Sequence, residues 1–155
     1  MLFLFSLYLQ YMDDNHYMQM ALEQARAAGE RNEIPIGAVI VCKGRVIARA
    51  HNLTETLNDP TAHAEMQAIT AATENLGGKY LTDCTLYVTV EPCPMCAAAL
   101  AWAQIPRIVY GADDPKRGYS LFSPNLLHPR TKVTKGVLAD ECSTLLTGFF
   151  KARRK

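Results

Sequence analysis

The feature that most constrains the fold of this chain is the alternation of short β-branched runs with segments of helical period. Strands are expected over residues 36–41, 46–50, 86–90 and 108–110, with a last one near Val133. Helices are expected over residues 13–29 and 94–104, and around an apolar stripe from Cys142 to Phe149. A further helix is expected to begin at a cap at Asp59 or Thr61 and to end at about residue 75. Interleaved strands and helices predict one α/β domain whose sheet is covered by helices.

The domain is expected to span residues 12–155. The chain has 155 residues, and a single domain usually has roughly 100–200. Residues 1–11 are interpreted as an N-terminal extension, either not native, disordered, or packed on the body. This segment is apolar, but it lacks the charged start of a signal peptide and is shorter than the ~20 residues of a membrane span. No membrane association is therefore expected.

Five cysteines, an odd number, argue against a disulfide framework. Reduced thiols in a cytoplasmic protein, some of them on a metal, fit this number better. Charge is distributed unevenly along the chain. Residues 1–106 carry 6 basic and 11 acidic side chains, whereas residues 107–155 carry 10 and 4, a net charge of +6. The basic charge of this C-terminal third is compatible with a nucleic acid partner. The long connection 111–130 is also more typical of a functional loop than of an idle one.

Two short motifs carry the chemistry: Thr61-Ala62-His63-Ala64-Glu65, and Glu91-Pro92-Cys93-Pro94-Met95-Cys96. Alone, Cys-x-x-Cys is compatible with a zinc half-site, a redox dithiol or chance. A catalytic zinc takes three protein ligands and leaves one position open. His63, Cys93 and Cys96 supply three ligands, and a structural zinc module would need a fourth. Glu65 is the carboxylate beside them and is suited to act as the base for a bound water.

His-x-Glu followed by Pro-Cys-x-x-Cys resembles the signature of zinc-dependent deaminases. From residue 12 onward the chain is similar to the bacterial tRNA-specific adenosine deaminases. The segments that carry this resemblance are Ile34–Val39, Ala50–Asn52, Asn58–Glu65, Leu86–Cys93, Arg107–Ala112 and Ala139–Phe150. The resemblance implies a three-layer α/β/α cytidine deaminase-like fold with a five-stranded mixed sheet. It also implies one zinc ion per subunit and a homodimer.

The implied reaction is the hydrolytic deamination of adenosine to inosine at the wobble position of a tRNA anticodon. In this interpretation Glu65 is catalytic, and His63, Cys93 and Cys96 hold the zinc. The residues expected to contact the substrate are Asn52, Ile36, Ala64, Asp114 and Lys116. The basic residues Lys151, Arg153 and Arg154 are expected to meet the anticodon stem-loop.

Two residues depart from the pattern of the tRNA enzymes. Pro94 stands where many of them have an aliphatic residue, and Ala98 replaces a common glycine. Pro-Cys-Pro-Met-Cys also occurs in relatives that act on free bases. A free-base or nucleotide deaminase, such as a guanine deaminase, is therefore the alternative.

Overall fold

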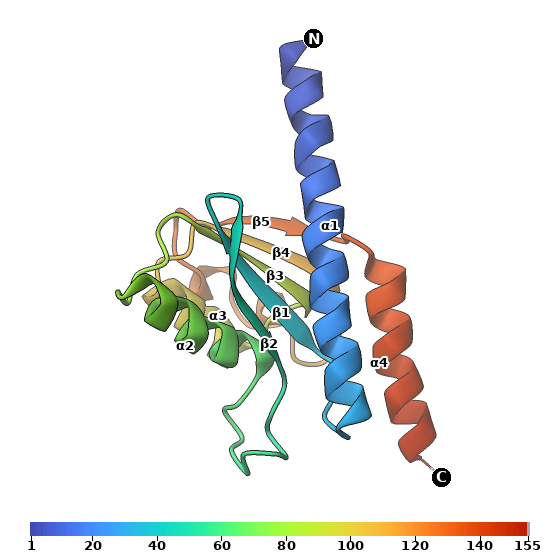
Figure 1. Ribbon diagram of the computed structural model, residues 1–155. Coiled ribbons are helices and arrows are strands. Elements are labelled where there is room, and N and C mark those ends of the chain that lie inside the picture. The colour runs from blue at the N-terminus through green and yellow to red at the C-terminus, as the bar shows by residue number, and fades with distance from the viewer. Residues whose placement is uncertain (155) are drawn as a thin grey trace.

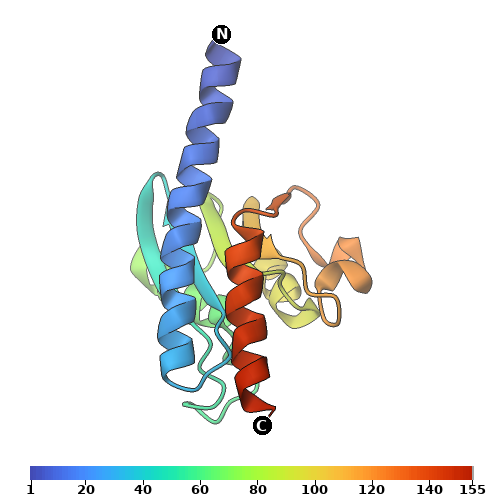
Figure 2. The ribbon, with the colours of Figure 1, turned by 90° about the vertical axis from the view of Figure 1, so that its right-hand side faces the viewer.

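The computed structural model describes residues 1–154, in which a five-stranded sheet lies between two layers of helices (Figure 1). The strands are β1 (Gly37–Cys42), β2 (Arg45–His51), β3 (Cys84–Val90), β4 (Arg107–Ala112) and β5 (Lys132–Lys135). The helices are α1 (Leu2–Glu30), α2 (Ala64–Leu76), α3 (Pro94–Trp102) and α4 (Ala139–Arg153). Helices α2 and α3 cover one face of the sheet. Helices α1 and α4 lie side by side on the other face (Figure 2).

The sheet is mixed and five-stranded, as the family resemblance implies, and its strand order is β2-β1-β3-β4-β5. Strand β1 runs antiparallel to β2 and β3, whereas β3, β4 and β5 are parallel. The β1–β2 hairpin turns at Lys43 and Gly44, whose φ angles are 51° and 76°. Positive φ at both turn positions is what a tight hairpin turn requires. Helix α3 forms the crossover between β3 and β4, since parallel neighbours need a long connection.

Helix α2 begins later than the sequence predicts. Its N-cap is His63, so the predicted caps Asp59 and Thr61 are wrong. The carboxylate of Asp59 instead accepts hydrogen bonds from the backbone N–H of Thr61 at 2.8 Å and from its hydroxyl at 2.7 Å. This local turn occupies the Asp59 side chain before the helix starts. The helix ends at Leu76, close to the predicted end near residue 75, and its C-cap Gly77 has a φ of 70°.

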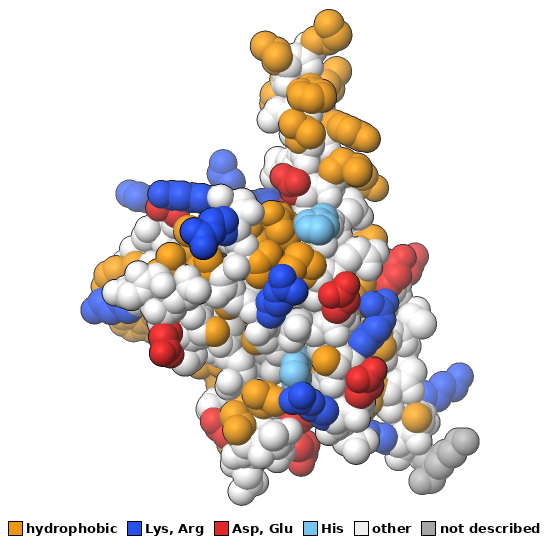
Figure 3. Space-filling view, viewed as in Figure 1, with side chains coloured by type: hydrophobic (Ala, Val, Ile, Leu, Met, Phe, Trp, Pro, Cys, Tyr) orange, Lys and Arg blue, Asp and Glu red, His pale blue; other side chains and the backbone are white. Residues whose placement is uncertain are grey.

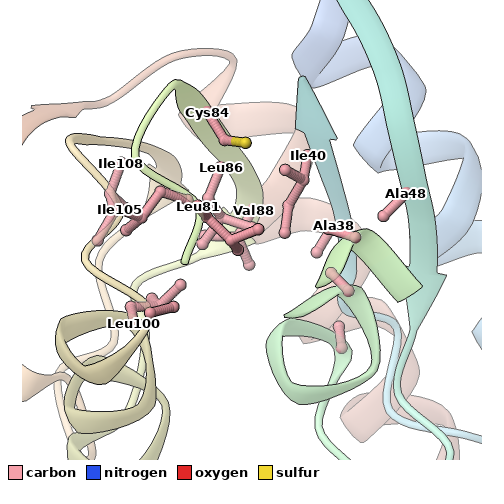
Figure 4. Packing of buried hydrophobic residues seen from close by; sticks show 14 of the residues in the cluster. Ala38, Ile40, Ala48, Leu81, Cys84, Leu86, Val88, Leu100, Ile105 and Ile108 are labelled. Carbon is pink, nitrogen blue, oxygen red and sulfur yellow. The ribbon is translucent and has the colours of Figure 1, made fainter. Parts of the chain in front are cut away.

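Two hydrophobic cores form because successive residues of each strand face opposite sides of the sheet. Ile40, Leu86 and Ile108 pack toward α2 and α3 (Figure 4). Val39, Tyr87 and Val109 pack toward α1 and α4. The two sets alternate along β1, β3 and β4, so each face of the sheet is covered and the three central strands are buried.

Helix α1 begins at Leu2 rather than at Asp13. Its first three turns are exposed and mostly apolar, and they project from the rest of the molecule (Figure 3). The buried residues of the helix start at Asp14, so residues 1–11 contribute nothing to the core. Within residues 1–154, no helix combines the length and the apolar character needed to cross a bilayer.

A buried ion pair fixes α1 to the sheet. Arg107 donates from Nη1 and Nη2 to the two carboxylate oxygens of Asp14, each at 2.8 Å. The hydroxyl of Tyr87 donates to the same carboxylate at 2.8 Å, and Arg107 also reaches Thr134 Oγ1 at 3.1 Å. Asp14 is only 5% exposed. One carboxylate therefore connects α1 with β3, β4 and β5.

Candidate metal and catalytic site

The site lies where two chain segments enter helices. His63 is the N-cap of α2, and Cys93 is the N-cap of α3. Both residues have extended backbone, with ψ angles of 156° and 169°. Pro94 follows at the first position of α3, where a missing N–H costs nothing. Two helix N-termini therefore direct unpaired N–H groups and positive dipole ends toward one place, which favours thiolates there.

His63, Cys93 and Cys96 form a group that could hold a metal ion. Their ligand atoms all lie within 4.8 Å of one another. His63 Nδ1 is 3.6 Å from the sulfur of Cys93 and 3.6 Å from that of Cys96. Two thiolates and one imidazole match the preferences of zinc, and three protein ligands leave the fourth tetrahedral position open. The residues present therefore fit a catalytic zinc site.

The two thiols of this group differ in acidity. Hydrogen bonds from Cys96 and, to a smaller extent, from His63 lower the pKa of Cys93 to about 4, against the opposing effect of burial. The hydrogen bond to Cys93 and burial raise the pKa of Cys96. The sulfur of Cys93 is therefore ionised at neutral pH, as a metal ligand must be.

Glu65 lies in the first turn of α2, is 4% exposed and contacts the thiol of Cys96. Burial raises the pKa of Glu65 to about 7. A carboxyl group that titrates near neutral pH can both accept and donate a proton, which suits general acid–base catalysis. The carboxylate is thus beside the metal ligands, as the sequence motif predicts.

Asn52, Ile36 and Ala64 lie close to the start of α2. The backbone N–H of Asn52 donates to the carbonyl of Ile36 at 3.1 Å, and its side-chain amide donates to Thr54 Oγ1 at 3.3 Å. The next residue, Leu53, donates to the carbonyl of Ala62 at 2.9 Å. These bonds bring the end of β2 against the segment that carries His63. Asn52 is 4% exposed, Ile36 is half-buried and Ala64 is buried.

Asp114 and Lys116 lie on the loop after β4. One carboxylate oxygen of Asp114 accepts from the backbone N–H groups of Lys116 and Arg117, both at 3.0 Å. Asp114 thereby shapes this turn, and the Lys116 side chain is exposed. The structure brings this loop to the metal group, because Tyr119 N–H donates to the carbonyl of Pro92 at 2.9 Å, next to Cys93.

Lys151, Arg153 and Arg154 lie at the end of α4, on the opposite face of the sheet from α2 and α3. The structure does not bring them together with the metal group. Arg153 donates to the backbone carbonyl of Asn32 at 3.0 Å and stacks over the ring of Phe149 at 4.2 Å. Arg153 therefore has a structural contact that the charge pattern of the sequence did not reveal.

Glu33 and Glu91 are two buried carboxylates that the sequence reasoning missed. Each accepts hydrogen bonds from a loop next to the metal group. The sequence feature that could have indicated them is an acidic residue next to a strand: Glu33 stands shortly before β1, and Glu91 directly after β3.

The fold and the site together define a class of protein. A helix-covered mixed sheet, with a His–Cys–Cys group and a buried glutamate at two helix N-termini, is the arrangement of cytidine deaminase-like enzymes. The family of MafB19-like deaminases matches residues 12–154.

Two similar proteins narrow this class. A tRNA-specific adenosine deaminase of Agrobacterium fabrum is 49% identical over 144 residues, which cover 90% of this chain and 95% of the relative. A solved structure from a study of A-to-I editing by tRNA:A34 deaminases is also 49% identical, with a TM-score of 0.79, and covers 84% of this chain and 99% of that one. The chain belongs to the family of tRNA-specific adenosine deaminases.

A more distant structure belongs to an enzyme that is named for a different substrate. The guanine deaminase of Nitrosomonas europaea has a TM-score of 0.75 at 25% identity, covering 87% of this chain and 83% of that one. The shared core is therefore compatible with more than one base as substrate.

Proposed function

We propose that this protein deaminates adenosine to inosine at the wobble position of a tRNA anticodon. The observation that carries the proposal is the buried Glu65 beside the His63–Cys93–Cys96 group. The similarity at 49% identity over most of the chain supports adenosine in tRNA as the substrate. The overall reaction consumes one water and releases one ammonia.

In this proposal His63, Cys93 and Cys96 hold one zinc ion per subunit. When bound, zinc lowers the pKa of a coordinated water toward ~7 and so makes a nucleophile available at neutral pH. The ionised sulfur of Cys93 and the two helix N-termini prepare the site for the cation.

Glu65 moves the protons. As a base it takes a proton from the attacking water and delivers it to the ring nitrogen beside C6. The oxygen adds to C6, and Glu65 next transfers the second water proton to the departing amino group, which leaves as ammonia. The position of Glu65 in the first turn of α2 suits both transfers, since it faces the metal group from the same helix as His63.

Asn52, Ile36 and Ala64 form the proposed binding site for the extruded base. An amide offers a donor and an acceptor together and suits the edge of a purine. Asn52 is held by its bonds to Ile36 and Thr54, so its orientation is fixed before the base arrives. Asp114 and Lys116 are proposed to meet the target nucleotide from the opposite loop.

The proposal includes RNA contacts by Lys116, Lys151, Arg153 and Arg154, which the basic charge of residues 107–155 supports. It also includes a homodimer in the cytoplasm. All five cysteines are free thiols, which suits a reducing compartment. Exposed apolar side chains at Trp102 (83%) and Phe122 (64%) support self-association, which sedimentation of the parent and of Trp102→Glu would test.

The decisive experiment is inosine mapping on tRNA treated with the purified protein. The parent should convert the wobble adenosine, and Glu65→Gln should lose at least ~10²-fold in rate while keeping about one zinc per chain. Glu74→Gln, on the exposed side of the same helix, is the matched control and should behave as the parent. Loss of zinc from Glu65→Gln, or substantial remaining activity, would refute the assigned roles.

Guanine deamination is the second candidate. Pro94 in Pro-Cys-Pro-Met-Cys and the fold of the guanine deaminase from Nitrosomonas europaea favour it. Ammonia release from free guanine and from an anticodon stem-loop, measured side by side, separates the two functions. We expect turnover of the stem-loop and none of guanine.

A further inference from the structure

The metal group lies beside two loops, and each loop is bonded to one buried glutamate. The first loop, residues 53–62, runs from β2 to α2, and the second, residues 113–120, follows β4. The first leads directly from Asn52 to His63, and the second contains Asp114 and Lys116. Both loops therefore carry, or connect, residues that the proposed function places against the substrate.

Glu91 holds the second loop. One of its carboxylate oxygens accepts from the backbone N–H of Asp114 at 3.2 Å. The other accepts from the backbone N–H of Ser120 at 3.1 Å and from its hydroxyl at 2.7 Å. These donors lie at the two ends of the turn that presents Lys116. One carboxylate thus connects the two ends of the loop.

The backbone around Glu91 ties this closed loop to the metal-binding segment. Glu91 N–H donates to the carbonyl of Ala112 at 2.8 Å, and Tyr119 N–H donates to the carbonyl of Pro92 at 2.9 Å. The carboxylate also lies directly against Gly118, where any Cβ would collide with it. Glu91 precedes Cys93 by two residues, so the loop and the metal ligand share one rigid support.

Glu33 holds the first loop in the same way. Its carboxylate accepts from the N–H of Glu55 at 3.0 Å, the N–H of Thr56 at 2.7 Å and the Thr56 hydroxyl at 2.6 Å. Glu33 is fully buried. Burial alone would raise its pKa, but the bonds from Thr56 and Glu55 lower it more, so the carboxylate stays ionised. Within residues 1–154, neither glutamate forms an ion pair at 4.0 Å or less.

We propose that Glu91 and Glu33 are positioning residues for the RNA substrate, each of which fixes one wall of the binding site relative to the metal ligands. The proposal rests on the proposed function for the identity of the substrate. Neutral N–H and O–H donors surround each carboxylate, so the role of the negative charge is to order backbone rather than to neutralise a cation. A glutamine would direct its NH₂ group at one of these donors and release part of the loop.

The test compares Glu91→Gln and Glu33→Gln with the exposed control Glu74→Gln. Steady-state kinetics use an anticodon stem-loop, zinc is measured by atomic absorption, and amide hydrogen exchange is followed by mass spectrometry. KM should rise by up to about 10- to 100-fold in each variant, since the loop loses a hydrogen bond to a charged group and substrate binding must then also supply the cost of ordering the loop. Zinc content should equal that of the parent, kcat should fall by a smaller factor, and exchange should quicken only in the affected loop.

A KM within twofold of the parent, or faster exchange across the whole sheet, would overturn the proposal. Should Glu91→Gln fail to fold, Ser120→Ala removes one bond from the loop side and should raise KM by a smaller factor. Thr56→Val does the same for Glu33. A parent that is inactive on the stem-loop would refute the proposed function instead, and the exchange measurement would still decide whether the two glutamates hold the loops.

Discussion

Replacing Asp14 by Asn should destabilise the fold through one buried carboxylate. Asp14 is 5% exposed and accepts three hydrogen bonds of 2.8 Å, two from Arg107 and one from Tyr87. The amide keeps the size of the side chain but turns an NH₂ group toward the guanidinium and leaves the Arg107 charge without its partner. Removing one partner of a buried pair costs about 3–5 kcal/mol. Because the Arg107 side chain keeps 18% of its surface exposed, we expect the lower end, about 3 kcal/mol.

For a chain of this size, about 1 kcal/mol shifts Tm by roughly 2–4 °C, so Asp14→Asn should melt about 6–12 °C below the parent. Circular dichroism during heating measures this shift. The neighbouring Asp13 is exposed, so Asp13→Asn is the matched control and should stay within about 2 °C of the parent. An Asp14→Asn protein that melts with this control would refute the reasoning. Replacing the whole cluster, as Asp14→Leu with Arg107→Met and Tyr87→Phe, should recover most of the loss.

Three further predictions concern packing, RNA binding and pH. Gly37→Ala should lower the free energy of unfolding, measured in urea, by about 1–3 kcal/mol or more, because its Cβ would collide with the backbone of α1. Gly148→Ala, in the open middle of α4, should instead raise it by about 0.5–1 kcal/mol, and equal effects of the two substitutions would contradict the packing argument. Replacing Lys116 and Arg154 by Ala should reduce the dependence of log K for a stem-loop on log salt by about 0.7–0.9 for each lost phosphate contact, and unchanged slopes would remove both residues from the interface. In the folded, metal-free protein the pKa of Glu65 is about 7 instead of 4.5, so the fold favours the neutral carboxyl. As pH rises between these two values, Glu65 ionises more readily in the unfolded chain, and the free energy of unfolding falls progressively. The free energy of unfolding of metal-free Glu65→Gln should therefore match that of the parent near about pH 4 and exceed it by up to about 3 kcal/mol at about pH 8. Chemical denaturation in the presence of a chelator measures this difference, and a difference independent of pH would exclude the ionisation of Glu65 as its cause.

The sequence predicts most of the core because its pattern has a direct physical meaning at each strand and helix. The run from Gly37 to Val41 is apolar on both faces, and this strand is indeed covered on both sides. The pair of cysteines separated by two residues, with Pro94 between them, places both thiols in the first turn of a helix. His63, Cys93 and Cys96 come together in the structure as their motifs predict.

The residues that the sequence reasoning missed act through contacts between distant segments. Asp14 and Arg107 are 93 positions apart, and Arg153 and Asn32 are 121 apart, so no local pattern links them. Glu33 and Glu91 look like ordinary acidic residues until their loops are placed over them. The N-cap of α2 was predicted too early because the turn formed by Asp59 competes for the same side chain. Apart from this local turn, these differences arise from tertiary contacts rather than from local propensity.

The position of the metal group at two helix N-termini has a consequence for how such an enzyme can change. The ligands are supported by β3, α2 and α3, which belong to the packed core, whereas the loops 53–62 and 113–120 beside them are each held by one glutamate side chain. Insertions or substitutions in these loops would therefore leave the packing around the metal group largely unchanged. Exchanging these loops between relatives would therefore change the surroundings of the metal group while the core that supports its ligands keeps its structure.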